Sequence, residues 1–110
     1  MSNTPRPVVL KAEAYVDTMP IQPTIGGTLH VTLEYNGNGE SGSLEKAVPQ
    51  GIVKNQLILN LVYSDEQIFI INPQTNTYEE QLHESSQYHS ILINFEGTEL
   101  TTITKIPIRK

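Results

Sequence analysis

Apolar residues alternate with more polar neighbours along two stretches of the chain, residues 8–16 and 29–35. In the first stretch the apolar positions are Val8, Leu10, Ala12, Ala14 and Val16, and in the second they are Leu29, Val31, Leu33 and Tyr35. A period of two residues places alternate side chains on opposite faces of a β-strand. The pattern therefore predicts two strands, each with one buried face.

Six further stretches have the length and composition of strands. Residues 57–63 are apolar on both faces apart from Asn60, which predicts a central strand covered on both sides. Residues 67–71 follow across a short polar turn, so we expect these two strands to form a hairpin. Residues 88–95 and 98–108 form another predicted strand pair, and weaker strands are expected at 43–48 and 75–82.

Composition agrees with a β-fold. The chain has 30 β-branched residues (Ile, Val and Thr) and only three alanines, and branching at Cβ suits a pleated sheet better than a helix. One segment, Glu79–Glu84, contains good helix formers and offers a single helical turn as an alternative. Pro107 lacks an amide hydrogen, so the last strand should lie at a sheet edge.

The predicted fold is a single all-β domain spanning residues 1–110, in which residues 1–7 form a flexible N-terminal tail. Seven or eight short strands favour an antiparallel β-sandwich, immunoglobulin-like or jelly-roll-like in architecture, with a small β-barrel as the alternative. The chain contains no cysteine or tryptophan, so any likeness to immunoglobulin domains concerns architecture alone.

Charge is distributed unevenly, with a net value of −5. No Lys or Arg occurs from Asn55 to Thr104, whereas seven carboxylates fall there. Because nucleic-acid binding needs a concentrated cationic surface, this half of the chain argues against it. The stretch is interpreted as solvated surface, with a docking face for a basic partner as the sharper hypothesis.

Localisation is predicted from the same composition. The longest apolar run is four residues, far below the roughly 20 that span a bilayer, so no membrane association is expected. The N-terminus has no apolar signal segment, and a cysteine-free chain is compatible with the cytoplasm. We therefore expect a cytoplasmic protein.

Catalytic and metal-binding patterns are weak. His83 and His89 flank Glu84 and follow Glu79 and Glu80, but their spacing matches no familiar metal-ligand motif. A serine near these histidines shows only proximity along the chain, without an oxyanion hole or an orienting acid. We predict no catalytic residue, no metal site and no cofactor.

A candidate interaction surface remains. Tyr15 is out of phase with the apolar residues of its strand and is the first candidate for an exposed aromatic, followed by Tyr78. The Gly- and Asn-rich segment 36–43 is expected to form a loop. The predicted surface residues are Tyr15, Asn36, Asn38, Glu40, Tyr78, Glu79, Glu80, His83, Glu84 and His89.

These features favour a non-catalytic binding or interaction module. An edge strand could accept a strand from an unidentified protein partner or from an identical chain. The alternatives are a small-ligand or carbohydrate binder, which predicts a pocket or exposed planar tyrosines, and a structural subunit of a larger assembly.

Overall fold

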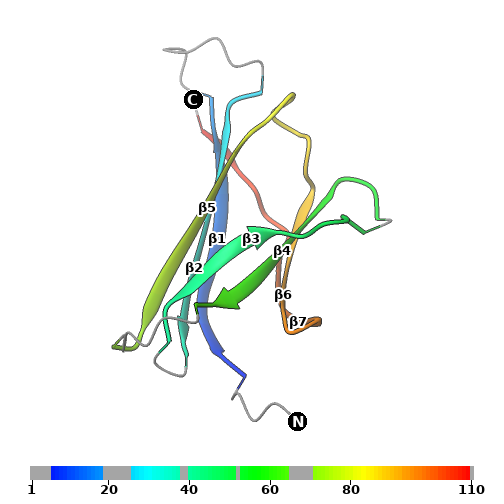
Figure 1. Ribbon diagram of the computed structural model, residues 1–110. Coiled ribbons are helices and arrows are strands. Elements are labelled where there is room, and N and C mark those ends of the chain that lie inside the picture. The colour runs from blue at the N-terminus through cyan, green and yellow to red at the C-terminus, as the bar shows by residue number, and fades with distance from the viewer. Residues whose placement is uncertain (1–5, 19–25, 38–39, 52, 65–70, 110) are drawn as a thin grey trace.

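The computed structural model describes residues 6–18, 26–37, 40–51, 53–64 and 71–109, and these residues form eight strands and no helix (Figure 1). The strands are β1 (Val8–Asp17), β2 (Thr28–Asn36), β3 (Gly42–Lys46), β4 (Gln56–Tyr63), β5 (Gln74–Gln81), β6 (Ser90–Phe95), β7 (Thr98–Ile103) and β8 (Ile108–Arg109). In this part of the chain there is accordingly no helix that could cross a bilayer.

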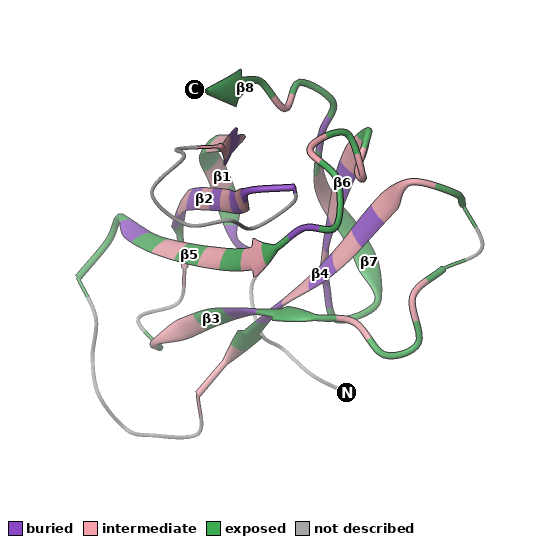
Figure 2. Cartoon of the chain, turned by 90° about the horizontal axis from the view of Figure 1, so that it is seen from above, coloured by how far each residue is buried: buried purple, intermediate pink, exposed green. Residues whose placement is uncertain are grey.

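The strands form two four-stranded sheets packed face to face. Sheet A has the order β5-β2-β1-β8, and sheet B has the order β3-β4-β6-β7 (Figure 2). The edge strands β3 and β5 contact each other on one side of the molecule, and β7 contacts β1 on the other. The predicted all-β sandwich is therefore confirmed, and the fold is not a closed barrel.

Two of the six strand pairings are parallel. Four pairs are antiparallel as predicted, but β4 pairs with β6 and β1 pairs with β8 in parallel. Parallel neighbours need a crossover connection, and here the chain passes through β5 of the other sheet between β4 and β6.

The core consists of the inward-facing residues of both sheets. Alternate positions of β2, β4 and β6 are buried, as the purple bands along these strands show in Figure 2. The residues with no or almost no exposure are Val16, Leu29, Val31, Leu33, Tyr35, Leu57, Leu59, Leu61, Ile91 and Ile93. The predicted alternation at residues 29–35 is therefore the pattern of burial along β2.

The alternation predicted for β1 holds only in its second half. Ala14 and Val16 are buried, but Val8 and Leu10 are 60% and 49% exposed. The register against β2 shifts between Val9 and Lys11, so Leu10 is the extra residue of a β-bulge. A bulge reverses the phase of the residues before it, and Val9 packs against the core instead.

The apolar strand β4 is central in sheet B, as predicted, but only one of its faces is fully covered. Ile58 and Asn60 are half-buried on the outer face, and Val62 is exposed. The predicted partner strand 67–71 lies outside the described residues except for Ile71, which is exposed and in no strand. The predicted hairpin therefore falls outside the described part of the chain.

Three further predictions are settled in the second half of the chain. Residues 79–81 belong to β5, so the alternative of a helical turn over Glu79–Glu84 is wrong. The predicted strand 98–108 is two strands, because β7 ends at Ile103 and the chain crosses to sheet A before β8. Strand β8, directly after Pro107, is an edge strand, as expected from that proline.

The N-terminal segment lies against the sandwich from residue 6 onward. Residues 1–5 of the predicted tail lie outside the described residues. The Arg6 guanidinium donates a hydrogen bond to the Glu99 carbonyl of β7, and Pro7 is buried.

Candidate functional site

The predicted surface residues of β5 lie on its two opposite faces. Successive side chains of a strand point to opposite faces, so Tyr78 and Glu80 turn toward the other sheet while Glu79 faces outward. Tyr78 and Glu80 are half-buried and Glu79 is exposed. The sequence therefore identified three neighbouring residues that do not share one surface.

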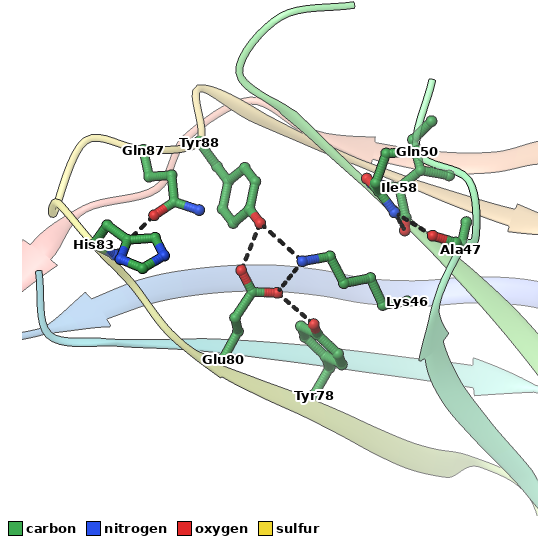
Figure 3. A network of polar contacts seen from close by, with 9 residues as sticks. All are labelled: Lys46, Ala47, Gln50, Ile58, Tyr78, Glu80, His83, Gln87 and Tyr88. Atoms are coloured by element: carbon green, nitrogen blue, oxygen red, sulfur yellow. Dashed lines mark hydrogen bonds and ion pairs between the residues drawn. The ribbon is translucent and has the colours of Figure 1, made fainter. Parts of the chain in front are cut away.

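Glu80 is the centre of a polar cluster that joins three segments (Figure 3). The hydroxyl groups of Tyr78 and Tyr88 donate to its two carboxylate oxygens, each at 2.5 Å. The Lys46 ammonium of β3 lies 3.1 Å from the first of these oxygens and donates to the Tyr88 hydroxyl at 3.4 Å. We call Lys46, Tyr78, Glu80 and Tyr88 the Glu80 cluster.

Near neutral pH, Glu80 and Lys46 of this cluster are charged and its two tyrosines are neutral. Burial alone would raise the pKa of Glu80, but the hydrogen bonds from Tyr78, Tyr88 and Lys46, with the charge of Lys46, outweigh it and lower this pKa. Burial raises the pKa of both tyrosines, and their bonds to Glu80 and its charge raise it further. For Lys46, burial would lower the pKa, but its bonds to Glu80 and Tyr88 raise it.

Chemically, this arrangement binds the sheets together. A carboxylate that accepts three charge-assisted or hydroxyl bonds is not poised to take up a proton, and neither tyrosine is acidified toward a nucleophile. Lys46 belongs to sheet B and Tyr78 and Glu80 belong to sheet A, so the cluster bridges the two sheets at their β3–β5 edge.

A second polar cluster lies further along the same edge. The Tyr35 hydroxyl donates to Asn76 Oδ1 at 2.5 Å and to Gln74 Oε1 at 3.2 Å, and Asn76 Nδ2 donates to the Gly42 carbonyl at 2.8 Å. Gln74 is 5% exposed and also donates to the Glu40 carbonyl at 2.6 Å. Burial, with the nearby Tyr63, raises the pKa of Tyr35 to about 12.

Tyr15 lies in a row of side chains that crosses the outer face of sheet A. Its ring stacks on His30 of β2 with centroids 4.8 Å apart, and the Arg109 guanidinium of β8 lies 4.0 Å from its centroid. His30 Nδ1 lies 3.2 Å from Glu79 Oε1 of β5. Each of the four strands contributes one residue to this row.

Both faces of the Tyr15 ring are therefore covered. Because β2 and β8 flank β1 on opposite sides, His30 and Arg109 lie against opposite ring faces. The prediction of an exposed Tyr15 is wrong: the residue is half-buried. A sugar would need an open ring face for stacking, and Tyr15 presents only its edge and hydroxyl.

The remaining predicted residues lie in the loops and at the strand ends around these clusters. Asn36 is exposed at the end of β2, Asn38 lies outside the described residues, and Glu40 is exposed but accepts the bond from Gln74 through its carbonyl. His83, Glu84 and His89 are exposed in the connection from β5 to β6. Among the described residues no three His, Cys, Asp or Glu side chains gather as metal ligands would.

The acidic half of the chain is divided among several surfaces. Glu79 lies on the outer face of sheet A, and Glu80 is half-buried between the sheets. Glu96 is exposed in the turn from β6 to β7, and Glu99 is exposed in β7. The fold therefore separates carboxylates that are close in sequence.

The alternation of residues in the sequence does not reveal the edge of β1 that faces away from β2. Strand β8 pairs only with Val16 and Asp17, so no described strand pairs with this side of β1 from Val8 to Tyr15. The amides of Val16 and Thr18 donate to the Pro107 and Arg109 carbonyls, both at 2.8 Å. Backbone groups alternate in direction along a strand, so those of Ala12 and Ala14 point to this side as well.

A groove runs beside this open edge. It encloses about 360 Å³ between residues 12–15 of β1 and residues 102–105 at the end of β7, with Pro107 and Arg109 at the point where β8 begins. Ala12 and Ala14 place only methyl groups on the edge. Glu13, Lys105 and Arg109 bring charge of both signs to the groove.

A larger hollow, of about 470 Å³, lies in sheet B where the paired part of β4 and β6 ends. It is lined by residues 60–64, Phe95 and the turn that follows, with Glu40 at its rim. Residues 65–70, which follow Ser64 of this lining along the chain, lie outside the described residues. We therefore assign no function to the hollow.

Four residues of the Glu80 cluster and of the Tyr15 row are not among the predicted surface residues: Lys46, Tyr88, His30 and Arg109. Each acts through a cross-strand or inter-sheet neighbour far along the chain, and the sequence gives no register between such strands. The one available signal was strand phase: His30 shares an outward position with polar Thr32 in the alternating stretch 29–35.

Comparison of the chain with protein-family models, curated protein sequences and solved structures finds no match.

Proposed function

We propose that this protein is a non-catalytic interaction module that binds an extended segment of a partner protein along the open edge of β1. The observation that carries the proposal is the unpaired stretch of β1 from Leu10 to Ala14, next to the groove. Added strands bind through backbone hydrogen bonds, while neighbouring side chains provide specificity.

The other edges support β1 as the docking strand. Edges β3 and β5 cover each other, with the Glu80 cluster between them. On β7, the Glu99 carbonyl already accepts a hydrogen bond from the Arg6 guanidinium. Along β1, Ala12 and Ala14 offer backbone donors and acceptors with minimal side-chain hindrance.

The chemistry of the polar clusters favours binding over catalysis. The carboxylate of Glu80 is saturated by its three donors, and the tyrosines around it have raised pKa values. The covered ring of Tyr15 also speaks against a carbohydrate platform on sheet A. A cytoplasmic setting, expected from the cysteine-free composition, is part of the proposal.

The test is selection of binders from a display library of random extended peptides, followed by titration of a selected peptide into isotope-labelled protein. We expect the largest amide shifts at Leu10–Ala14, and Ala12→Pro should weaken binding at least about tenfold because it removes an edge donor. Thr77→Pro, which places proline on the opposite edge of sheet A, is the matched control and should bind normally.

Two results would contradict the proposal. Selected peptides whose shifts map elsewhere would place the binding surface on another element. Equal binding by Ala12→Pro and the native chain, with both folded by circular dichroism, would mean that the β1 edge is not used.

A further inference from the structure

We infer that a second copy of this chain pairs with the open edge of β1 through its own β1, antiparallel and related by a two-fold axis at Ala12. The inference rests on the proposed function, because it names the occupant of the same edge. A two-fold pairing is self-complementary, so each contact made by one copy is repeated by the other.

Backbone geometry permits this register. The amide and carbonyl of Ala12 both point to the open side, so two copies of Ala12 can exchange both hydrogen bonds across the axis. The facing side chains at the centre are then methyl groups. Leu10 of each copy lies opposite Ala14 of the other, which fills the stretch that β8 leaves open.

Charge favours the same register. With Ala12 on the axis, Lys11 of each copy lies directly opposite Glu13 of the other, on the outer face of the sheet. Both side chains are largely exposed, at 62% and 57%, and the ion pair that they form with each other within the chain, at 3.6 Å, would be exchanged for pairs across the axis. Opposite charges at directly facing positions stabilise a strand pair.

Exposed apolar residues gather at the ends of the same edge. Val8, Leu10 and Ile108 are 60%, 49% and 47% exposed. In the Ala12-centred register, Val8 of one copy would face Val16 of the other, whose edge Ile108 already occupies, so the paired stretch ends at Leu10 and Val8 lies beside Ile108. The dimer therefore covers apolar surface at both ends of the paired stretch, and the bulge at Leu10 lets β1 bend past β8.

The paired stretch is short, so the expected dimer is weak and forms with a dissociation constant on the order of 100 μM. Sedimentation equilibrium of the full chain up to about 1 mM should show a reversible monomer–dimer equilibrium. The test compares the native chain with Lys11→Glu, Glu13→Lys and the double exchange of both residues. Glu45→Lys, with the same charge change on exposed β3, is the control.

We expect each single reversal to weaken self-association about tenfold, because like charges then face each other twice. The double exchange should restore it to within about twofold. A mixture of Lys11→Glu and Glu13→Lys should form a heterodimer more tightly than either variant dimerises alone. Glu45→Lys should dimerise like the native chain.

A chain that stays monomeric at about 1 mM overturns the inference, as does a double exchange no better than the single reversals. The peptide selection distinguishes this failure from failure of the proposed function. If the chain is monomeric but selected peptides still bind β1, only the inference of a dimer fails. If the chain is monomeric and the selected peptides bind elsewhere, both the inference and the proposed function fail.

Discussion

At the scale of single residues, Gly42 of β3 lies directly against side chains of sheet A. A Cβ at this position would collide with the Tyr35 hydroxyl and lie 2.9 Å from Asn76 Oδ1. These two groups are hydrogen-bonded to each other, and the Tyr35 hydroxyl also contacts Gln74 Oε1. The absence of a side chain at Gly42 is therefore what allows β3 to approach β5.

Replacing Gly42 by alanine should lower the free energy of unfolding by about 2–3 kcal/mol, because the polar cluster must move to admit the methyl group. Gly51→Ala is the control, since its Cβ would meet only the tip of the Ile58 side chain. That variant should stay within about 1 kcal/mol of the native chain. Urea denaturation measures both, and equal effects would show that Gly42 is not constrained.

Glu80 predicts a pH dependence of stability. Its pKa is lower in the folded chain than the ordinary value of 4.5, because its hydrogen-bond donors and Lys46 outweigh the opposing effect of burial. Its stabilising contribution is therefore complete above about pH 4.5 and is lost as the pH falls through the folded pKa. The unfolding free energy of Glu80→Gln should decline less than that of the native chain across this acidic range.

At neutral pH the same substitution should cost about 1–2 kcal/mol, because a charge-assisted contact with Lys46 is lost. Glu45→Gln, on the exposed face of β3, provides the control and should leave both quantities nearly unchanged. Parallel pH profiles for Glu80→Gln and the native chain would argue against the role assigned to this carboxylate.

At the scale of elements, β1 combines two strand segments of different phase. Leu10 is the extra residue of the bulge, with Val9 packed inward before it and Ala12 half-buried after it. Deleting Leu10 should remove the bulge without reversing either segment, because Val9 and Lys11 then alternate regularly.

Deletion of Leu10 should therefore preserve a cooperative unfolding transition and cost less than about 1 kcal/mol. Deletion of Leu33, a fully buried residue within the regular part of β2, is the contrast and should abolish cooperative unfolding, because it shifts the register of the remaining strand. Thermal unfolding followed by circular dichroism measures both. Loss of cooperativity in the Leu10 deletion would contradict the bulge assignment.

The element scale also shows what the sequence could predict. Alternation located β1 and β2, and an apolar run located β4, because strand phase is a local property. The bulge at Leu10 and the division of residues 98–108 between two sheets depend on pairing with distant strands. The same holds at the candidate site: Tyr78, Glu79 and Glu80 were identified, but their separation and the partner Lys46 follow from packing.

At the scale of the whole molecule, the two sides of the sandwich differ. On the β3–β5 side, the Glu80 cluster and the bonds around Tyr35 fasten the sheets together. On the opposite side, β8 pairs only with the end of β1; β7 contacts β1, but no described strand pairs with the rest of this edge, and a groove lies between it and the end of β7. This asymmetry places the proposed docking surface on one side.

Amide hydrogen exchange at Ala12 tests this claim most directly. Glu13, the next residue, points its amide toward β2 and serves as the internal reference. In dilute protein we predict that the Ala12 amide exchanges at least about 100-fold faster than that of Glu13, because no residue in the described part of the chain pairs with it. An Ala12 amide as protected as that of Glu13 would show that the edge is closed and would contradict the account.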